Sequence, residues 1–471
     1  MMDNNDEVTA IDETNNIIEG TNGNAGKRTQ PSIKFLTLNT WGLKYVSKHR
    51  KERLKAIADQ IARCSTALSI SGITNDSNED YDIIALQEIW VKEDWEYIVK
   101  RCGDLYPYHR IFYSGILTGP GLAILSKIPI KSTFLYRFPI NGRPRDVLRG
   151  DWYVGKSIAI TELEPVNDQT GPLVIMNSHM HAPYALTGDN AYECHRSCQA
   201  WDFSKLIKLY KKAGFSVVVV GDLNSRPGSL PHKFLTLETG LVDSWEQLHG
   251  KQDLEKISSM DPLQQLEYGC TTCDSFLNTW RSYLGTKKAQ RLDYALIDSD
   301  GLQTIAAGAR FTERIPNIGS FSDHFAYSCT LKLLPRKPIE TDLNHRGHQF
   351  ATSSQDELVD RYTTYQEGLD CLHEYMKKAQ RQQYLWGIYF WFALILLFGY
   401  LLFGARLSSN VTFLSSIFWG LFIIVIAITG TIAGGISFLF GRGEIRSLLE
   451  VEQELLDAER HMEKYLGIDR R

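Results

Sequence analysis

The chain has 471 residues, of which 43% are hydrophobic and 23% charged, a globular composition that excludes a wholly disordered or fibrous chain. Its 51 lysines and arginines against 55 aspartates and glutamates give a formal net charge of -4, so the overall basic field expected of a nucleic-acid-binding protein is missing. Eight cysteines in a chain of this length, behind an N-terminus without an apolar signal segment, favour a reducing compartment over a disulfide scaffold.

Residues 1–30 are expected to form a disordered acidic tail, because they contain too little apolar surface to offset the entropy cost of ordering. Short β-branched runs follow, and each predicts a strand. They span residues 33–38, 81–86, 121–125, 156–161, 173–176, 217–220, 292–297 and 326–333. Helical spacing separates several of them, for instance between Leu54 and Ile61. Residues 31–335 are therefore predicted to form an α/β layered domain.

The C-terminal region has a different pattern. Residues 336–383 are expected to be a linker and juxtamembrane segment. Residues 386–405 and 417–440 are uncharged runs, each long enough to cross a hydrocarbon core of ~30 Å as a helix. They predict a transmembrane hairpin within residues 384–440, followed by a cytosolic amphipathic helix over residues 441–471. Chemistry and anchoring are thus expected to belong to separate parts of the chain.

Basic residues predict how the hairpin is oriented. Five of them flank its outer ends, whereas the connecting loop holds only Arg406, so the catalytic domain and both termini are expected to be cytosolic. The five are Lys377, Lys378, Arg381, Arg442 and Arg446. Such a cluster attracts anionic phospholipids, which we expect to activate the protein. Gly430 and Gly434 have the small-residue spacing that allows close helix approach, within the hairpin or in a homodimer.

Polar residues accumulate at the ends of the predicted strands. They are Asn39, Glu88, His179, Asp222, Asn224, Asp293, Asp323 and His324. Any one of the Asp or Asn residues alone is best explained as a turn residue. Together, hard oxygen ligands beside two histidines suit Mg²⁺-assisted attack on a phosphate, because the ion prefers oxygen ligands while histidines transfer protons.

The segments that contain these residues resemble the exonuclease, endonuclease and phosphatase fold family, which includes deoxyribonuclease I, inositol polyphosphate 5-phosphatases and neutral sphingomyelinases. The resemblance lies in residues 36–41 (LTLNTW), 86–88 (LQE), 221–225 (GDLNS), 291–294 (RLDY) and 322–324 (SDH). It implies a two-layered β-sandwich flanked by helices, as in deoxyribonuclease I. The Trp-x-Asp-Arg box of the 5-phosphatases is missing. Residues 115–121, residues 177–182 and the C-terminal hairpin instead resemble neutral sphingomyelinases, in particular fungal inositol phosphosphingolipid phospholipases C.

The resemblance also implies roles for individual residues. Glu88 would be the principal Mg²⁺ ligand, with Asn39 and Asp323 beside it. Asp222 and Asn224 would hold the phosphate and the attacking water.

Two histidines would then move the protons. His324, oriented by Asp293, would activate water, and His179 would protonate the departing ceramide oxygen. In this family the residues at Asp151 and Lys156 are implicated in activity and its control by anionic lipid.

The function implied is an Mg²⁺-dependent phospholipase C that hydrolyses membrane sphingolipids, either inositol phosphosphingolipids or sphingomyelin, to ceramide and a phosphorylated head group. Nucleic acid is not an expected partner. The expected location is the endoplasmic reticulum membrane, with the mitochondrial outer membrane as a further site. The alternatives are a membrane-tethered phosphoinositide phosphatase or nuclease of the same fold, and a non-enzymatic lipid sensor.

Two further motifs are best explained without a functional role. Residues 150–157 (GDWYVGKS) match the phosphate-binding loop of nucleotide hydrolases, but that loop requires a following helix, and a strand is predicted after Lys156. Cys270 and Cys273 have zinc-ligand spacing without a second such pair, so buried free thiols are expected. His181 is expected to be structural.

Overall fold

A computed structural model describes residues 31–70, 80–115, 119, 121–146, 149–167, 170–185, 187–335, 354–407 and 413–468. The expected acidic tail, residues 336–353 of the expected linker and residues 408–412 between the two apolar runs lie outside the described residues.

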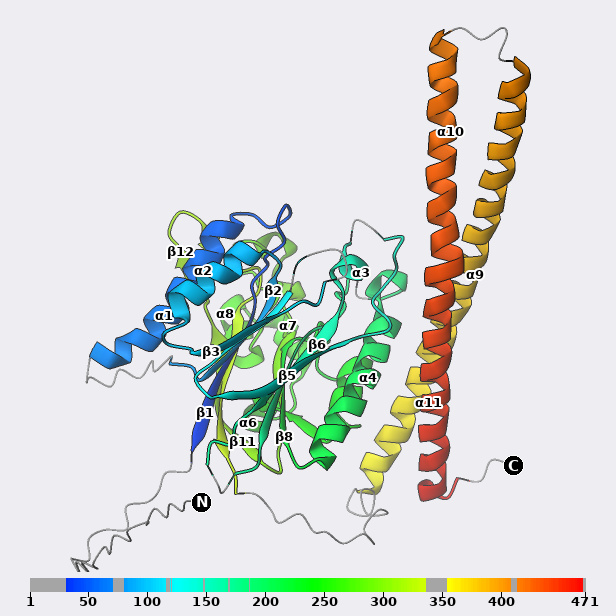
Figure 1. Ribbon diagram of the computed structural model, residues 1–471. Coiled ribbons are helices and arrows are strands. Elements are labelled where there is room, and N and C mark those ends of the chain that lie inside the picture. Colours follow the sequence, from blue (N-terminus) through cyan, green and yellow to red (C-terminus); the bar gives the residue numbers. More distant parts are fainter. Residues whose placement is uncertain are drawn as a thin grey trace, which may run out of the picture.

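Two six-stranded sheets form a β-sandwich (Figure 1). The first sheet has the order β11 (Leu302–Arg310), β14 (Ala326–Leu333), β1 (Ser32–Asn39), β2 (Ile83–Ile89), β4 (Gly121–Ser126) and β3 (Tyr108–Phe112). The second has the order β5 (Ile130–Arg137), β6 (Ser157–Leu163), β7 (Leu173–His179), β8 (Ser216–Asp222), β10 (Asp293–Asp298) and β9 (Leu241–Asp243). The short strands β12 (Arg314–Ile315) and β13 (Gly319–Ser320) pair separately. The predicted two-layered sandwich is confirmed, and each of the eight expected strands overlaps an observed one.

Apolar side chains alternate between the two faces of the central strands, and this alternation builds the layers. In β1, Ile33 and Phe35 face the core between the sheets, while Leu36 and Leu38 face a second core under the flanking helices. This period of two is what lets a central strand bury both faces. Each sheet contains one parallel pair, β1 with β2 and β7 with β8. Because parallel strands end at the same edge, the polar residues that follow them are brought together.

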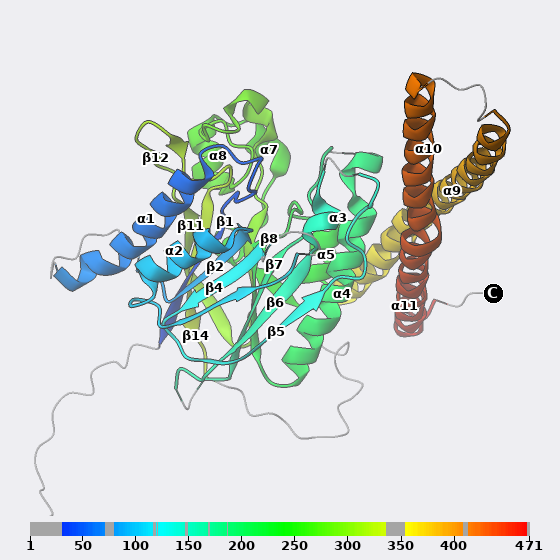
Figure 2. The same ribbon diagram turned by 45° about the horizontal axis from the view of Figure 1, so that its top comes forward.

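Helices cover both outer faces of the sandwich, as Figures 1 and 2 show from two angles. The first sheet is covered by α1 (Arg50–Ile70) and α2 (Lys92–Cys102), and the second by α4 (Glu193–Lys212) and α5 (Leu230–Thr236). The short helices α3 (Asp151–Val154), α6 (Ser244–His249), α7 (Leu254–Ser259) and α8 (Pro262–Gly269) lie in the connections, together with single 3-10 turns at Asp189–Ala191, Ser282–Leu284 and Thr286–Lys288.

Two long apolar helices follow the sandwich. The helix α9 (Gln355–Leu407) runs up to the loop, and α10 (Phe413–Gly434) returns through a π-helical stretch, Gly435–Gly441, into α11 (Arg442–Leu466). The spans 355–403 and 415–466 each contain a window apolar enough to cross a membrane. Leu401, Phe418 and Leu421 in these spans are at least half exposed. Exposed apolar surface of this kind fits contact with lipid.

The helical segments on either side of the apolar spans pack against the catalytic domain. Residues 355–383, expected as linker and juxtamembrane segment, are helical, and Tyr365 and Leu369 are buried in the same core as Trp201 of α4 and Phe234 of α5. From α11, Leu448, Val451 and Leu455 join that core. Polar contacts reinforce it, since Trp201 Nε1 donates to Glu454 Oε2 over 2.6 Å. The spacing of these apolar residues is helical, but a sequence pattern does not say which surface such a helix will cover.

We predict that Leu455→Ala destabilises the catalytic domain, because Leu455 is only 2% exposed and its truncation leaves a cavity beside α4 and α5. The free energy of unfolding in detergent should fall by about 2–5 kcal/mol. Leu449→Ala on the same helix is the matched control, because Leu449 is 42% exposed and its loss should cost less than about 0.5 kcal/mol. Equal stability of the two variants would show that α11 does not support the sandwich.

Candidate active site

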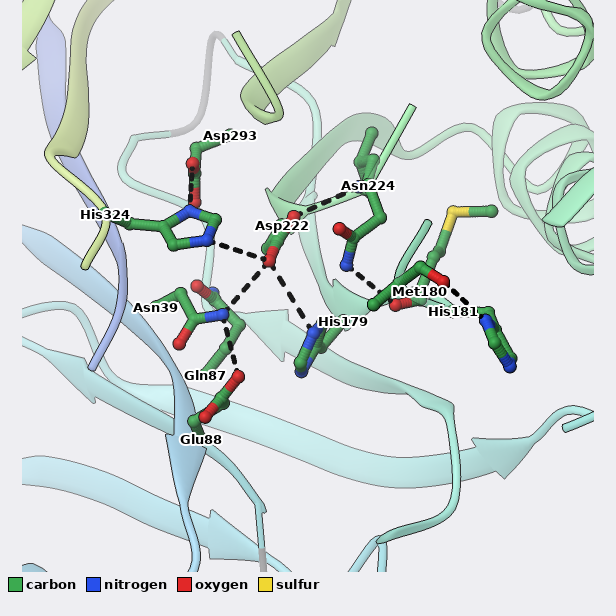
Figure 3. Close-up of polar contacts among 12 residues, drawn as sticks. Asn39, Gln87, Glu88, His179, Met180, His181, Asp222, Asn224, Asp293 and His324 are labelled. Atoms are coloured by element: carbon green, nitrogen blue, oxygen red, sulfur yellow. Dashed lines mark hydrogen bonds and ion pairs between the residues drawn. The ribbon is translucent and has the colours of Figure 1, made fainter. Parts of the chain in front are cut away.

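Candidate catalytic residues converge at one edge of the sandwich (Figure 3). His179 and Asp222, the last residues of β7 and β8, are register partners. Asp222 is also the register partner of Asp293, the first residue of the antiparallel strand β10. Asn39 ends β1, and His324 precedes β14. Side chains distant in sequence therefore meet because of how the strands are ordered.

Glu88 reaches the site through a β-bulge. The register between β2 and β4 shifts between Gln87 and Ile89, and Glu88 has a φ of 61°. A bulge leaves one residue unpaired and re-aims its side chain. Gly42 accommodates this backbone, because a Cβ at residue 42 would lie 2.0 Å from the carbonyl oxygen of Glu88. A positive φ is uncommon for glutamate, and such strain is typical of functional sites.

The surroundings of Glu88 fit a hard cation. Asn39 Nδ2 donates to Glu88 Oε1 over 3.0 Å, whereas the buried Glu88 Oε2 has no hydrogen-bond partner among the described residues. Burial, followed by the negative charge of Asp323, raises the pKa of Glu88. A divalent cation would satisfy the orphaned oxygen and offset the repulsion between the carboxylates. Asp323 itself is ion-paired with Arg281.

A second group of possible ligands consists of Asp222, Asp293 and His324, whose ligand atoms lie within 4.8 Å of one another. In this group His324 Nδ1 donates to Asp293 Oδ2 over 2.8 Å. The site thus contains acidic ligands able to hold a metal ion. The oxygen-only set around Glu88 suits a hard cation better than the histidine-containing group, in which one imidazole nitrogen is already engaged.

The pair formed by His324 and Asp293 has the geometry of an oriented base. Burial alone would lower the pKa of His324, but Cys273, Asp293 and Asp222 raise it well above the usual range. The Cys273 thiol is neutral at pH 7, because burial raises its pKa to about 12, so the two carboxylates account for the effect. Asp293 therefore both fixes the imidazole and strengthens it as a base.

Asp222 lies between the two histidines. Its Oδ2 accepts from Asn39 over 3.0 Å and lies 3.6 Å from His179 Nε2 and 3.8 Å from His324 Nε2. Burial raises the pKa of Asp222 to about 7, with His324 opposing and Asp293 adding to the rise. The backbone N–H of Asn224 donates to Asp222 Oδ1, and its side chain donates to the Met180 carbonyl, each over 3.0 Å.

Asp151, Lys156 and His179 form a buried chain. Lys156 Nζ lies 2.7 Å from Asp151 Oδ1 and 3.2 Å from His179 Nε2. Burial and then the charge of Lys156 hold the pKa of His179 well below its usual range. Lys156 is thus the charged donor, and His179 Nε2 accepts from it. The expected role of His179 as an acid stays a prediction, and in this geometry its proton would have to come through Lys156.

The remaining sequence motifs have structural explanations. Lys156 is followed directly by strand β6, so residues 150–157 lack the helix that a nucleotide-binding loop requires. Cys270 and Cys194 are buried in different hydrophobic cores, so the cysteines do not combine into a zinc site. His181 is 1% exposed and stacks on Tyr192 at 4.1 Å, which agrees with a structural role.

Some supporting residues carry no sequence signal that distinguishes them. Arg281 is paired with Asp323, and the Tyr184 hydroxyl donates to Asp151. Asn177 joins the two sheets under the site: its Oδ1 accepts from Gln87 Nε2 over 2.8 Å, and its Nδ2 donates to the Leu86 carbonyl over 3.1 Å. Gln87 and Asn177 lie within the segments on which the family resemblance rests, whereas Arg281 and Tyr184 lie in irregular loops.

The sandwich and this edge define a member of the endonuclease/exonuclease/phosphatase family, whose model matches residues 36–324; the chain belongs to that family. An inositol phosphosphingolipids phospholipase C of Saccharomyces cerevisiae is 62% identical over 443 residues, 93% of this chain and 92% of that protein. Its namesake in Schizosaccharomyces pombe is 33% identical, covering 93% and 96% of the respective chains. The sphingomyelin phosphodiesterase 2 of Mus musculus is 31% identical, covering 65% and 67%.

We predict that Asp293→Asn lowers the pKa of His324, because it removes the carboxylate 2.8 Å from Nδ1. A histidine NMR titration should then show His324 losing its proton at lower pH than in the wild type. Asp298→Asn is the matched control, since Asp298 ends the same strand β10 and is paired with Lys211 instead. If the titration of His324 did not move, Asp293 would not control its proton.

Proposed function

We propose that this chain is a phospholipase C that hydrolyses the phosphodiester of sphingolipids to ceramide and a phosphorylated head group. It is a phosphodiester-hydrolysing enzyme, as its relatives' names indicate over most of its length. The observation that carries the chemistry is the meeting of the pair His324–Asp293 with Glu88 and Asp222 at one edge. Because all four are present, a decayed, non-enzymatic lipid sensor is disfavoured.

The attacking water is activated by His324. Its Nδ1 is held by Asp293, so Nε2 is the atom that takes the proton. Asp222 and Asn224 hold the phosphate and the water beside it, and Asn39 fixes Asp222 through Nδ2. Because Asp293 raises the pKa of His324, the imidazole must lose a proton before it acts. Activity should accordingly increase as pH rises through that pKa.

The departing ceramide oxygen is proposed to be protonated on the opposite side of the site, where Lys156 and His179 lie. Lys156 holds a positive charge against Asp151 and donates to His179. We assign Lys156 to stabilising negative charge there and His179 to delivering a proton, which Lys156 replaces. Asp151 keeps Lys156 in place. Both side chains are buried, so water does not weaken the ion pair.

The cation is proposed to be Mg²⁺, with Glu88 as principal ligand and Asn39 and Asp323 beside it. Bound Mg²⁺ would polarise the phosphoryl oxygen and neutralise charge that develops on it. The oxygen-only ligand set is the support for Mg²⁺ over a softer metal.

An assay of head-group release from purified lipids tests the function. Inositol phosphoceramide and sphingomyelin should both be tested with Mg²⁺ present. A phosphoinositide and DNA serve as the substrates of the alternative enzymes of this fold. Hydrolysis of either alternative substrate in preference to the sphingolipids would contradict the proposal.

We predict that Glu88→Ala abolishes turnover while the fold remains intact, because it removes the ligand whose Oε2 has no protein partner. Head-group release should be measured at saturating Mg²⁺, with the circular dichroism spectrum as a check of folding. Glu93→Ala, an exposed residue in the first turn of α2, is the control and should retain full activity. Near wild-type activity of Glu88→Ala at saturating Mg²⁺ would overturn the ligand assignment.

Membrane attachment is proposed to place the site beside its substrate. The two apolar helices are compatible with membrane association. We propose that they form the transmembrane hairpin, with the catalytic domain and both termini cytosolic, in the endoplasmic reticulum and also in the mitochondrial outer membrane. Tethering raises the local concentration of the enzyme at the lipid surface. A homodimer through Gly430 is less favoured, because a Cβ there would already lie 2.9 Å from Ala393 of the same hairpin.

Anionic phospholipids are proposed as activators through the basic residues that flank the two outer ends of the hairpin. Lys378 is already paired, lying 2.8 Å from Asp189 and 2.7 Å from Glu374. The other four, Lys377, Arg381, Arg442 and Arg446, are exposed. Each basic residue near an anionic leaflet is worth about 1 kcal/mol.

We predict that replacing the four exposed basic residues by Gln weakens stimulation by phosphatidylserine and its sensitivity to salt. Turnover should be measured on vesicles with and without phosphatidylserine. Lys464→Gln, an exposed change near the other end of α11, is the control and should respond as the wild type does. If phosphatidylserine stimulated the fourfold variant and the wild type equally, the activating lipid would act elsewhere.

A further inference from the structure

A polar cavity of about 650 Å³ opens beside the catalytic edge. Asn224 lines it, so it is continuous with the residues proposed to hold the phosphate. Its other walls come from the segment between β7 and α4, from the loop after β8 and from the stretch before β10. Its volume lies within the range of small-molecule binding sites.

Three cations line this cavity: Arg196, Arg226 and Lys288. Arg226 is half-buried and Lys288 exposed, and neither side chain has a hydrogen bond or ion pair with a described residue. Arg196 is 8% exposed, and its buried Nε has no partner among the described residues. Arg196 Nη1 donates to the Ala191 carbonyl, so Arg226 and Lys288 are the cations of this cavity without a side-chain partner among the described residues. Such cations are a site for an anion or for hydroxyl groups.

The acidic residues of the cavity do not neutralise these cations fully. Two carboxylates, Glu193 and Asp274, also line it. Asp274 is drawn toward Arg281, whose Nε lies 3.7 Å from Asp274 Oδ1. Burial lowers the pKa of Arg196 to about 10, against the raising effect of the charges of Glu193 and Asp151. Glu193 therefore partly balances Arg196, which leaves Arg226 and Lys288 as the cations available to a ligand.

The same walls are poorly suited to a quaternary ammonium. Such a group is recognised by the faces of aromatic rings. Tyr184 is the aromatic residue that lines the cavity, and the guanidinium of Arg149 already lies over its ring, 4.9 Å from the centroid. The polar lining also includes Ser229 and Gln290, which can exchange hydrogen bonds with hydroxyl groups.

We propose that this cavity binds the polyhydroxylated head group of the lipid and that Arg226 and Lys288 select it against a choline head group. The inference rests on the proposed function and adds the residues that set its specificity. The head group would leave the site with its phosphate through the cavity, since Asn224 lies at the junction. Additional phosphate on the head group would meet the same cations.

The test compares two lipids with the same ceramide, inositol phosphoceramide and sphingomyelin, hydrolysed by the full-length enzyme in mixed micelles. Arg226→Ala and Lys288→Ala should each lower kcat/KM for inositol phosphoceramide on the order of tenfold, the scale of a charge-assisted hydrogen bond. Both should leave kcat/KM for sphingomyelin unchanged. Arg226→Lys should recover part of the loss. Lys212→Ala, an exposed change at the far end of α4, is the matched control.

Inhibition by the free head group distinguishes a head-group site from general phosphate binding. Inositol 1-phosphate should inhibit the wild type more strongly than Arg226→Ala, whereas inorganic phosphate should inhibit both equally. An equal loss on both lipids, or no loss on either, would overturn the head-group site while leaving the proposed function in place. A wild type that released no inositol phosphate at all would instead overturn the proposed function, and the head-group site with it.

Discussion

The burial of negative charge at one edge is the constraint on which this structure depends. Glu88, Asp222 and Asp293 all lie at this edge, where carboxylates repel one another and lose solvation. The fold compensates each differently: His324 engages Asp293, Asn39 donates to both Glu88 and Asp222, and one oxygen of Glu88 is left without a partner among the described residues. The remaining excess of negative charge is the physical basis for proposing a bound cation at this edge.

The backbone adopts strained conformations where it places these side chains at the edge. Glu88, in the bulge of β2, and Asn224, in the loop after β8, both have positive φ, 61° and 48°. At Gly221 a Cβ would lie 2.0 Å from the Ser178 carbonyl, so glycine lets β7 and β8 approach closely just before His179 and Asp222. Below these residues, Asn177 joins the two sheets through hydrogen bonds with Gln87 and the Leu86 carbonyl.

Much of this organisation could be predicted from the sequence, because strand-end positions are local. Eight β-branched runs identified the central strands, and the polar residues after them were expected to meet. The four edge strands β3, β5, β9 and β11 were missed. In β3, β5 and β11, Tyr108, Phe134 and Ile305 leave at least 39% of their surface exposed, so these strands lack a buried pattern, while β9 is only three residues long. The bulge at Glu88 and the ion pair of Arg281 depend on register and loop geometry, which no spacing encodes.

The C-terminal helices were the least predictable element, and they change how anchoring relates to chemistry. The apolar faces of α9 and α11 complete the core against α4, so the hairpin continues directly from the catalytic domain. At the end of the second apolar run, Phe440 packs against Trp152 with ring centroids 4.9 Å apart, and Trp152 is the residue next to Asp151. Tyr375 and Glu444 hydrogen-bond over 2.6 Å, and Glu444 lies 3.2 Å from His195 at the start of α4. The position of the hairpin is therefore linked to the buried pair of Asp151 and Lys156 through Trp152, the neighbour of Asp151 in the chain.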